Sequence, residues 1–304
     1  MPILFALVGA TGVGKTKLSI ALAKEFHAQI ISMDSRQVYK GFCIGTAQPS
    51  KESLEEVPHH LVDFLPPQEK FSVGEFVRNV KALLQKDSTP YILVGGTGMY
   101  LQALSEGLAQ IPDVAEEVRI ECERFLLKNG VDALYQRVLE LDPASANAVE
   151  RQDKQRLLRA LEVFEQTGKR FSEVRNSRVG GIGHIKTFVL NRLRTTLYEN
   201  IDSRVMEMVN AGWKDEVACL YETVPQTAPA WQSLGYKEWV SAIRGEMNEE
   251  EVVERVRQGT RRYAKRQLTW FRHQVEGERV ELGPEFFRDF ERVAFLAVAA
   301  SGDV

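Results

Sequence analysis

The first residues of this chain that indicate a specific chemistry form a glycine-rich run near the N-terminus. Gly9-Ala10-Thr11-Gly12-Val13-Gly14-Lys15-Thr16 matches the spacing G-x-x-x-x-G-K-[ST] at every position. In this pattern the glycines let successive backbone N–H groups converge on phosphate oxygens, the lysine reaches a phosphate, and the threonine hydroxyl ligates Mg2+. The run therefore predicts that residues 9–16 bind a diphosphate or triphosphate, with Thr16 as the metal ligand. It leaves the attached organic group open.

Two further segments are expected close to this loop. Asp34 follows residues 29–33, which are predicted to form a strand, so its carboxylate should emerge at the carboxyl edge of the sheet beside the glycine loop. A carboxylate there either holds Mg2+ or takes a proton from a nucleophile, and both roles stay open at this point. Gly95-Gly96-Thr97-Gly98 closes another predicted strand at the same edge, and we expect its bare backbone to face the phosphate site.

The elements that must position these residues predict an α/β fold, a P-loop NTPase-like parallel sheet flanked by helices. Strands are predicted at 3–8, 29–33, 91–94 and 185–190, with helices at 16–26, 72–84 and 201–221. Residues 114–128, 131–141 and 154–167 have helical patterns, and no convincing strand lies between 112 and 183. We therefore expect a core of residues 1–112 and 184–304 with an inserted all-helical domain at 113–183. After residue 245 the pattern is all helical, and Asn248 with Glu251 predicts the start of a long amphipathic helix.

The distribution of charge favours a polyanionic partner. The net charge is only -3, but residues 255–275 contain seven basic and no acidic residues, and residues 151–194 contain eleven basic and four acidic ones. With 44% hydrophobic and 27% charged residues the composition excludes wholesale disorder and fibrous structure. No segment of 18 apolar residues is present, so no membrane association is expected, and the N-terminal run lacks the basic leader of a signal peptide.

The cysteines and histidines argue against a metal or disulfide framework. Cys43, Cys122 and Cys219 lie far apart and form no CxxC or Cys/His ligand spacing, which favours a reducing cytoplasm. His59 and His60 also lack partners at ligand spacing and are interpreted as structural or polar loop residues.

Several segments together resemble one family, the bacterial tRNA dimethylallyltransferases. The resemblance rests on GATGVGKT at 9–16, DSRQVYKG at 34–41, IGTAQP at 44–49, PHHLVDF at 58–64, VGGTGMY at 94–100, DKQRLLRALEV at 153–163, LGYKE at 234–238 and RRYAKRQLTWFR at 261–272. Their order and spacing cover most of the chain. The chain departs from the usual family residues at Ala10, where proline is common, at Arg36, where methionine is common, and at Gln48, where lysine is common.

The resemblance implies transfer of a dimethylallyl group from dimethylallyl diphosphate to the N6 amine of adenosine 37 in the anticodon loop of tRNA, with release of diphosphate. It makes Asp34 the candidate base, while Lys15, Arg204 and Mg2+ held by Thr16 would stabilise the departing diphosphate. The glycine loop is then expected to bind the isoprenoid diphosphate rather than primarily ATP, and the adenine to be flipped into a channel between the core and the insertion. A cytoplasmic monomer is expected.

The resemblance also implies contacts with the anticodon stem-loop from several separate segments. The implied tRNA-binding residues are Asp34, Ser35, Arg36, Gln37, Thr97, Arg119, Gln155, Arg156, Leu157, Leu158, Arg159, Gly235, Tyr236, Lys237, Lys265, Arg266 and Arg272. Trp270 and Phe271 are predicted to face the core.

Two other functions are compatible with parts of this pattern. A P-loop small-molecule kinase would also use a glycine loop, a downstream aspartate and a helical lid. A nucleotide-gated RNA-binding protein would use the basic stretches but would need no base at Asp34.

Overall fold

The computed structural model describes residues 3–86, 88–111 and 113–299. The chain divides into two compact units, which we call the core unit (Met1–Ala103 with His184–Val304) and the insertion unit (Leu104–Gly183). The insertion unit thus begins at Leu104 rather than at the expected residue 113.

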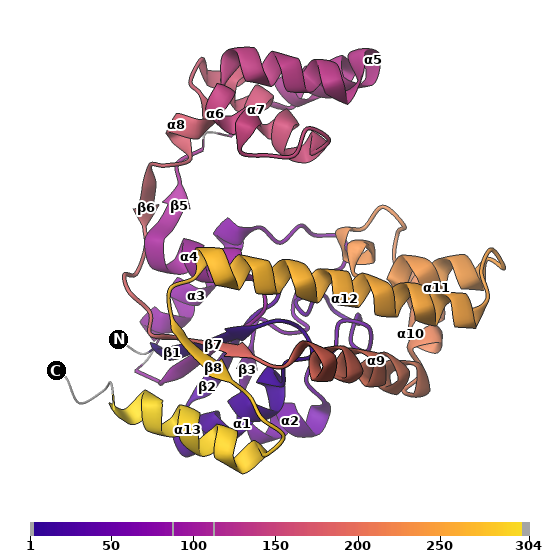
Figure 1. The fold of residues 1–304 in the computed structure, drawn as a ribbon. Helices are drawn as coiled ribbons and strands as arrows, with labels where there is room; N and C mark the ends of the chain where they lie inside the picture. The colour runs from indigo at the N-terminus through magenta and orange to yellow at the C-terminus, as the bar shows by residue number, and fades with distance from the viewer. Residues whose placement is uncertain (1–2, 87, 112, 300–304) are drawn as a thin grey trace. The chain divides into compact units, whose positions relative to one another are not determined.

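The core unit contains a six-stranded, all-parallel sheet with the order β3-β2-β4-β1-β7-β8 (Figure 1). Its strands are β1 (Ile3–Gly9), β2 (Gln29–Met33), β3 (His59–His60), β4 (Tyr91–Gly95), β7 (Thr187–Asn191) and β8 (Glu278–Glu281). The central strands are short apolar runs buried on both faces, as expected for a parallel sheet covered by helices. The four predicted strands are confirmed. The two edge strands, β3 and β8, were not predicted because both are short and rich in polar residues.

The register of the sheet aligns the segments predicted to do chemistry. Gly95 at the end of β4 pairs with Val8 of β1 on one side and with Met33 of β2 on the other. The chain leaves these three strands in neighbouring positions at one edge of the sheet. The glycine loop, Asp34 and the second glycine loop therefore start side by side.

Helices cover both faces of this sheet. In Figure 1 α1 (Lys15–Glu25) and α13 (Phe286–Ala299) lie on one face, and α3 (Val73–Lys86), α4 (Gly98–Glu106) and α12 (Glu249–Gln274) lie on the other. Apolar residues of α1 and α13 pack on strand residues such as Phe5 and Phe188 to form the main core. A second core of aromatic residues, including Phe42 and Trp239, joins α9 (Arg194–Asn210), α10 (Trp213–Thr223), α11 (Tyr236–Ile243) and the start of α12. The short α2 (Lys51–Glu56) and a 3-10 helix (Pro229–Gln232) complete the unit.

Two sequence predictions about the C-terminal half are corrected by the structure. The single helix expected at 201–221 is divided into α9 and α10, because Gly212 has a φ of 89° that a continuous helix does not accommodate. The region after residue 245 is not all helical, because β8 adds to the sheet beside β7. The predicted helix start is confirmed: Asn248 accepts from the Glu251 N–H at 2.9 Å and Glu251 accepts from the Asn248 N–H at 3.2 Å.

The insertion unit is a small helical cluster on a two-stranded ribbon. Its helices are α5 (Glu116–Leu141), α6 (Pro143–Asn147), α7 (Lys154–Thr167) and α8 (Phe171–Val174), packed around buried residues such as Leu134, Val138 and Leu161. Gly130, with a φ of 81°, interrupts α5 between the two helices predicted there. Within the expected bounds of 113–183 the insertion is not all helical, because β6 (Arg178–Gly180) pairs antiparallel with β5 (Gly107–Ala109).

Among the described residues, none of the helices combines the length and the apolar character needed to cross a bilayer.

Candidate active site

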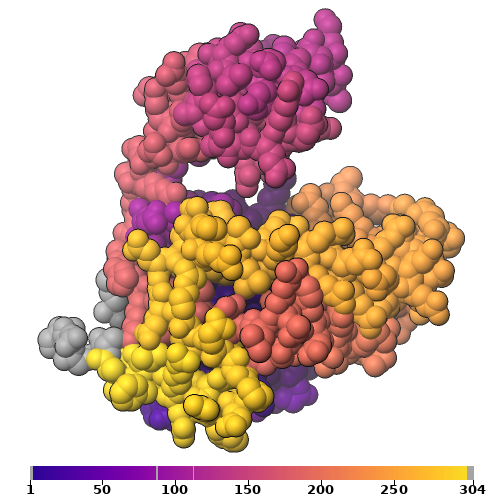
Figure 2. Space-filling model, viewed as in Figure 1, coloured from indigo at the N-terminus to yellow at the C-terminus, as the bar shows by residue number. Residues whose placement is uncertain are grey.

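A cavity of about 730 Å³ lies in the core unit at the carboxyl ends of β1, β2 and β4. It is lined by residues of the glycine loop at 9–16, which we call the phosphate loop, by the turn at residues 34–37, by the loop at residues 45–50, and by side chains from α9 and α12. Figure 2 shows the surface of the core unit hollowed between α12 and α9. The structure therefore brings the predicted diphosphate site and the predicted base into one enclosure.

The phosphate loop has the backbone geometry that its glycines predict. Gly12 and Gly14 have φ values of 80° and 111°, a region that other residues rarely adopt. A Cβ at Gly12 would also lie 2.8 Å from Cγ1 of Ile201 on α9, so α9 packs directly against the loop. Thr16 lies in the first turn of α1 and lines the cavity. The N-terminus of α1 thus points its unpaired N–H groups and its partial positive charge at this site.

The side chain of Lys15 is held inside the loop by backbone carbonyl groups of the same loop. Its Nζ donates to the carbonyl oxygens of Gly9 and Ala10, both at 2.9 Å. Burial and the nearby charge of Arg204 lower the pKa of Lys15 to about 7, and the carboxylate of Asp34 opposes that shift. The lysine is therefore poised to gain or lose its proton near neutral pH.

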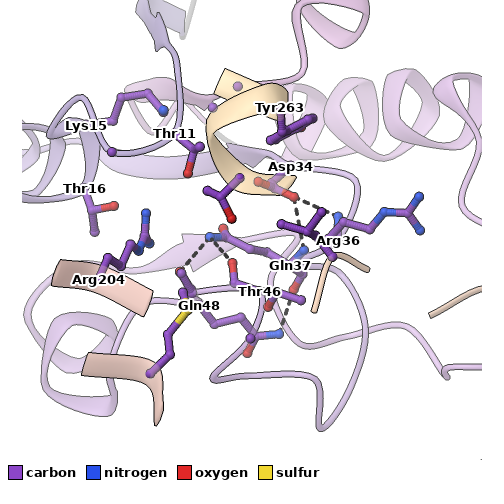
Figure 3. A pocket seen from close by; sticks show the side chains of 18 of the residues that line it. Thr11, Lys15, Thr16, Asp34, Arg36, Gln37, Thr46, Gln48, Arg204 and Tyr263 are labelled. Atoms are coloured by element: carbon purple, nitrogen blue, oxygen red, sulfur yellow. Dashed lines mark hydrogen bonds between the residues drawn. The ribbon is translucent and has the colours of Figure 1, made fainter. Parts of the chain in front are cut away.

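Arg204 on α9 is the second cation of the cavity. Burial lowers the pKa of Arg204, while the charges of Asp34 and Glu207 act in the opposite direction. A guanidinium keeps its proton throughout the physiological range, so Arg204 supplies a permanent positive charge. Figure 3 shows Lys15, Thr16, Asp34 and Arg204 around the same space. The charge distribution suits an anion with several oxygens, as a diphosphate has.

Asp34 is oriented by the turn that follows it. Its Oδ1 accepts from the backbone N–H of Arg36 at 2.8 Å and from that of Gln37 at 3.3 Å (Figure 3). Both contacts use the same oxygen, so they hold Oδ1 at the turn, and the other carboxylate oxygen takes no part in these two bonds. The acidic side chain is therefore presented to the cavity in a defined orientation.

Tyr263 on α12 lies beside Asp34 and was not among the predicted site residues (Figure 3). Burial and the negative charge of Asp34 raise the pKa of Tyr263, so its phenol keeps its proton at neutral pH. The sequence did not predict Tyr263 as a site residue, because the basic residues around it indicate the exposed face of α12. The signal that would have found it is its helical spacing, one turn before the buried Gln267.

The second glycine loop receives the side chains of α12. A Cβ at Gly96 would lie 2.2 Å from Nε2 of Gln267, and a Cβ at Gly98 would lie 2.1 Å from Nε1 of Trp270. Gln267 donates to the Gly96 carbonyl at 3.0 Å and accepts from the Thr11 N–H at 2.9 Å, so it joins the two glycine loops. Gly96 also lines the cavity, as expected, but the packing of α12 is the reason that these positions require glycine. Gln267 is a second residue that sequence reasoning missed.

The other predicted site residues fall into three groups by location. Ser35, Arg36, Gln37 and Arg266 line the cavity. Lys237, Lys265 and Arg272 are exposed elsewhere on the core unit, while Thr97 is half-buried at the start of α4. In the insertion unit Arg119, Gln155 and Arg156 are exposed, Leu158 and Arg159 are half-buried, and Leu157 is buried. Back in the core unit, Gly235 and Tyr236 are buried. Phe271 is buried as predicted, whereas Trp270 is half-buried against Gly98.

The two adjacent histidines have structural contacts. Nδ1 of His59 lies 2.7 Å from the Val57 carbonyl oxygen, and Nε2 of His60 lies 2.7 Å from Oε1 of Gln29. Burial lowers the pKa of His59, which keeps its ring neutral. Across the described part of the chain, histidine, cysteine and acidic side chains form no group of three or more that would hold a metal ion.

Comparison with known proteins identifies the family. The model of the IPP transferase family matches residues 37–274, and a model described as isopentenyl transferase matches residues 2–63. This chain belongs to the IPP transferase family. A tRNA dimethylallyltransferase of Symbiobacterium thermophilum is 43% identical over 289 residues, which are 93% of this chain and 90% of that protein.

Solved structures agree with this assignment. The full-length tRNA isopentenylpyrophosphate transferase from Bacillus halodurans superposes with a TM-score of 0.71 at 34% identity, over 98% of this chain and 95% of that one. A eukaryotic dimethylallyltransferase, captured in crystallographic snapshots while acting on tRNA, has a TM-score of 0.79 at 28% identity, over 99% of this chain and 79% of that one. The predicted α/β fold is thereby confirmed, and an IPP transferase is supported over a small-molecule kinase.

Proposed function

We propose that this IPP transferase is a tRNA dimethylallyltransferase, which moves a dimethylallyl group from dimethylallyl diphosphate to the N6 amine of adenosine 37 in the anticodon loop. One observation carries the proposal: the phosphate loop, the two cations Lys15 and Arg204, and one oriented carboxylate share a single cavity. The names of the relatives support the same reaction.

Residues 9–16 would hold the diphosphate end of the donor. As the bond between the allylic carbon and the diphosphate oxygen breaks, negative charge grows on the leaving group and positive charge on the allyl carbons. Lys15 and Arg204 face the growing negative charge, so they stabilise the transition state more than the ground state. A loop of this type recognises phosphates alone, so the rest of the cavity would have to select the organic group.

Asp34 would act as the base for the amine. The lone pair of an adenine N6 amine is delocalised into the ring, so removing a proton as the new N–C bond forms lowers the barrier. The turn holds Oδ1 of Asp34 through two backbone N–H groups, and Oδ2 is then free to take that proton. The products are N6-dimethylallyladenosine and diphosphate, with the amine proton on the carboxylate.

The residues of the cavity fit a Mg2+ ion that would be held mainly by the phosphate oxygens of the donor. No all-protein acidic cage exists among the described residues, but Mg2+ needs only one or two protein oxygens when phosphates supply the others. The Thr16 hydroxyl lines the cavity and would hold it. When bound, the ion would supply positive charge against the leaving diphosphate.

The anticodon stem-loop would be bound by basic residues of both units. In the core unit Lys237, Lys265, Arg266 and Arg272 are exposed and suit backbone phosphates. The insertion unit offers the basic Arg119, Arg156 and Arg159, and the neutral Gln155 and Leu158 would add contacts beside them. The side chains of Leu157 and Tyr236 are buried, so their part in tRNA binding would be to shape the surface. The three cysteines are free thiols, which suits a reducing compartment, and we propose that the protein works as a monomer in the cytoplasm.

A transfer assay tests the proposal. The protein is incubated with dimethylallyl diphosphate, Mg2+ and an anticodon stem-loop, and the nucleosides are then analysed by mass spectrometry. We expect one added C5H8 unit on adenosine 37, and none on a matched stem-loop with guanosine there, because guanosine lacks the N6 amine. If no dimethylallyl group is transferred and the protein instead uses ATP to phosphorylate a nucleoside or a small alcohol, the kinase is favoured.

A further inference from the structure

Glu216 on α10 binds two separate segments of the chain with one carboxylate. Its Oε2 accepts from the backbone N–H groups of Cys43 at 3.0 Å and Ile44 at 2.7 Å. Its Oε1 accepts from the Tyr236 hydroxyl at 2.7 Å, and the Gly45 N–H lies 3.5 Å from the same oxygen. Three consecutive backbone N–H groups that converge on a carboxylate form an anion-binding concavity, and this concavity belongs to the loop that continues along the cavity wall.

Trp213, on the preceding turn of α10, holds the same two segments from the side. Its indole lies between Gly45 and Gly235: a Cβ at Gly45 would lie 2.2 Å from Nε1, and a Cβ at Gly235 would lie 2.2 Å from Cη2. The ring is 1% exposed and packs edge-on against Tyr236, with ring centroids 5.8 Å apart. We call Trp213 and Glu216 together the α10 clamp.

The clamped loop is connected directly to the turn that orients Asp34. Nε2 of Gln48 donates to the Gln37 carbonyl at 2.9 Å, and Nε2 of Gln37 donates back to the Ala47 carbonyl at 2.8 Å. Oε1 of Gln37 accepts from the Ser32 hydroxyl at 3.0 Å, at the end of β2. The Gln37 backbone N–H is one of the two donors that hold Oδ1 of Asp34. Figure 3 shows this network between Asp34, Gln37, Thr46 and Gln48.

We infer that Glu216 is a positioning residue for the transfer reaction: it fixes residues 43–48 and, through Gln37 and Gln48, the orientation of Asp34 at the acceptor side of the cavity. The inference rests on the proposed function, because the acceptor amine is what Asp34 would serve. It assigns Glu216 no contact with either substrate. The diphosphate side is built from the phosphate loop and Arg204, to which Glu216 makes no hydrogen bond among the described residues.

A charged acceptor suits this position better than any neutral side chain. Hydrogen bonds to a carboxylate are shorter and stronger than those between neutral groups, and here one side chain satisfies up to four donors. An apolar side chain would leave the Cys43 and Ile44 N–H groups without their acceptor. The loop would then gain freedom at the point where it braces Gln37. A misplacement of about 1 Å in a reacting group costs on the order of 100-fold in rate.

Steady-state transfer with two Glu216 variants tests this role. Glu216→Leu has nearly the same size but no acceptor, and we expect kcat/KM for the stem-loop to fall about 10- to 100-fold. Glu216→Gln restores one oxygen for the backbone N–H groups and an amide for the Tyr236 oxygen but lacks the charge, so we expect it to recover part of that loss and to stay at least about threefold below the parent. The KM for dimethylallyl diphosphate should stay within about twofold of the parent in both variants, because the phosphate loop is separate.

A matched control and a stability measurement complete the experiment. Glu222 is an exposed glutamate on the same helix, so Glu222→Leu should behave as the parent does. Thermal unfolding shows whether each variant is folded at the assay temperature. If Glu216→Leu is unfolded there, the role is still supported when kcat/KM for the stem-loop falls at least threefold in Glu216→Gln while the KM for the donor is unchanged. Parent-like kcat/KM in a folded Glu216→Leu, or in Glu216→Gln when the leucine variant is unfolded, overturns the inference. So does an equal loss of donor binding and stem-loop turnover. A parent protein that transfers no dimethylallyl group would instead contradict the proposed function.

Discussion

The affinity for the donor should decrease as the pH rises above about 7, because Lys15 loses its proton in the free protein. Burial and the positive charge of Arg204 lower the pKa of Lys15 to about 7, and a bound diphosphate would favour the charged form. The sign follows directly: binding is strongest below the pKa of free Lys15 and weakens above it. Over the same range the unfolded chain holds this proton more tightly than the folded one, so Lys15 makes folding more favourable as the pH rises from about 7 towards 10.5.

The magnitude follows from the fraction of charged lysine. One pH unit above the pKa about a tenth of Lys15 is protonated in the free protein, and two units above it about a hundredth. If the bound diphosphate keeps Lys15 charged, the dissociation constant should rise about fivefold between pH 7 and 8, because half of Lys15 is already neutral at pH 7, and about ninefold again by pH 9. These steps correspond to about 1.0 and about 1.3 kcal/mol of binding free energy.

Calorimetric titration of the protein with dimethylallyl diphosphate measures this effect. In two buffers of different ionisation enthalpy, binding at about pH 8.5 should take up close to one proton per donor. The Lys15→Met variant has no titrating group at this position, so it reports any titration of the ligand itself. An affinity that stays constant between about pH 6 and 8.5, or an equal pH dependence in Lys15→Met, would refute the assignment of Lys15 as the titrating phosphate ligand.

Three further outcomes are expected. Asp34→Asn keeps an oxygen for the turn but cannot take a proton, so single-turnover transfer should slow by about 10² to 10⁴-fold with donor affinity intact; lost donor affinity that Mg2+ restores would make Asp34 a metal ligand instead. Arg266→Ala and Arg272→Ala should each weaken stem-loop binding and reduce its logarithmic salt slope by about one ion or slightly less, and a binding constant insensitive to salt and to both changes would contradict a phosphate contact. Gly96→Ala should reduce the free energy of unfolding in urea by about 1 to 3 kcal/mol, because the added methyl group meets the amide of Gln267; Gln267→Ala in the same chain should recover part of the loss, and additive losses would argue against that contact.

The parts of the fold that sequence analysis predicted are those determined by local chemistry. The phosphate loop and the capping box of α12 depend on residues a few positions apart, and the central strands depend on continuous apolar runs. The edge strands β3 and β8 have no such local signal, because only their pairing with β2 and β7 makes them strands. The division of α9 from α10 depended on Gly212 alone, within an otherwise helical pattern.

The candidate site shows the same limit. Lys15 and Asp34 were predicted from motifs and from the ends of neighbouring strands, and the register of the sheet brings those ends together. Tyr263 and Gln267 were missed although they lie in a stretch that sequence analysis singled out. Their role depends on which face of α12 meets the two glycine loops. The basic residues of this helix indicate its exposed face, but they say little about which side chains its buried face presents.

Glycines in the segments that carry the family resemblance have two distinct physical causes in this structure. Gly12 and Gly14 are required by left-handed backbone at the phosphate loop, where bare N–H groups face the cavity. Gly45, Gly96 and Gly98 instead make room for large side chains from α10 and α12, and Gly235 does so with a left-handed backbone as well. A substitution in the second group therefore acts first on the packing of those helices. Helix α10 holds the loop that supports the Asp34 turn, and α12 holds both glycine loops. The geometry of the cavity therefore depends on two helices whose buried faces contribute few of the groups proposed to react.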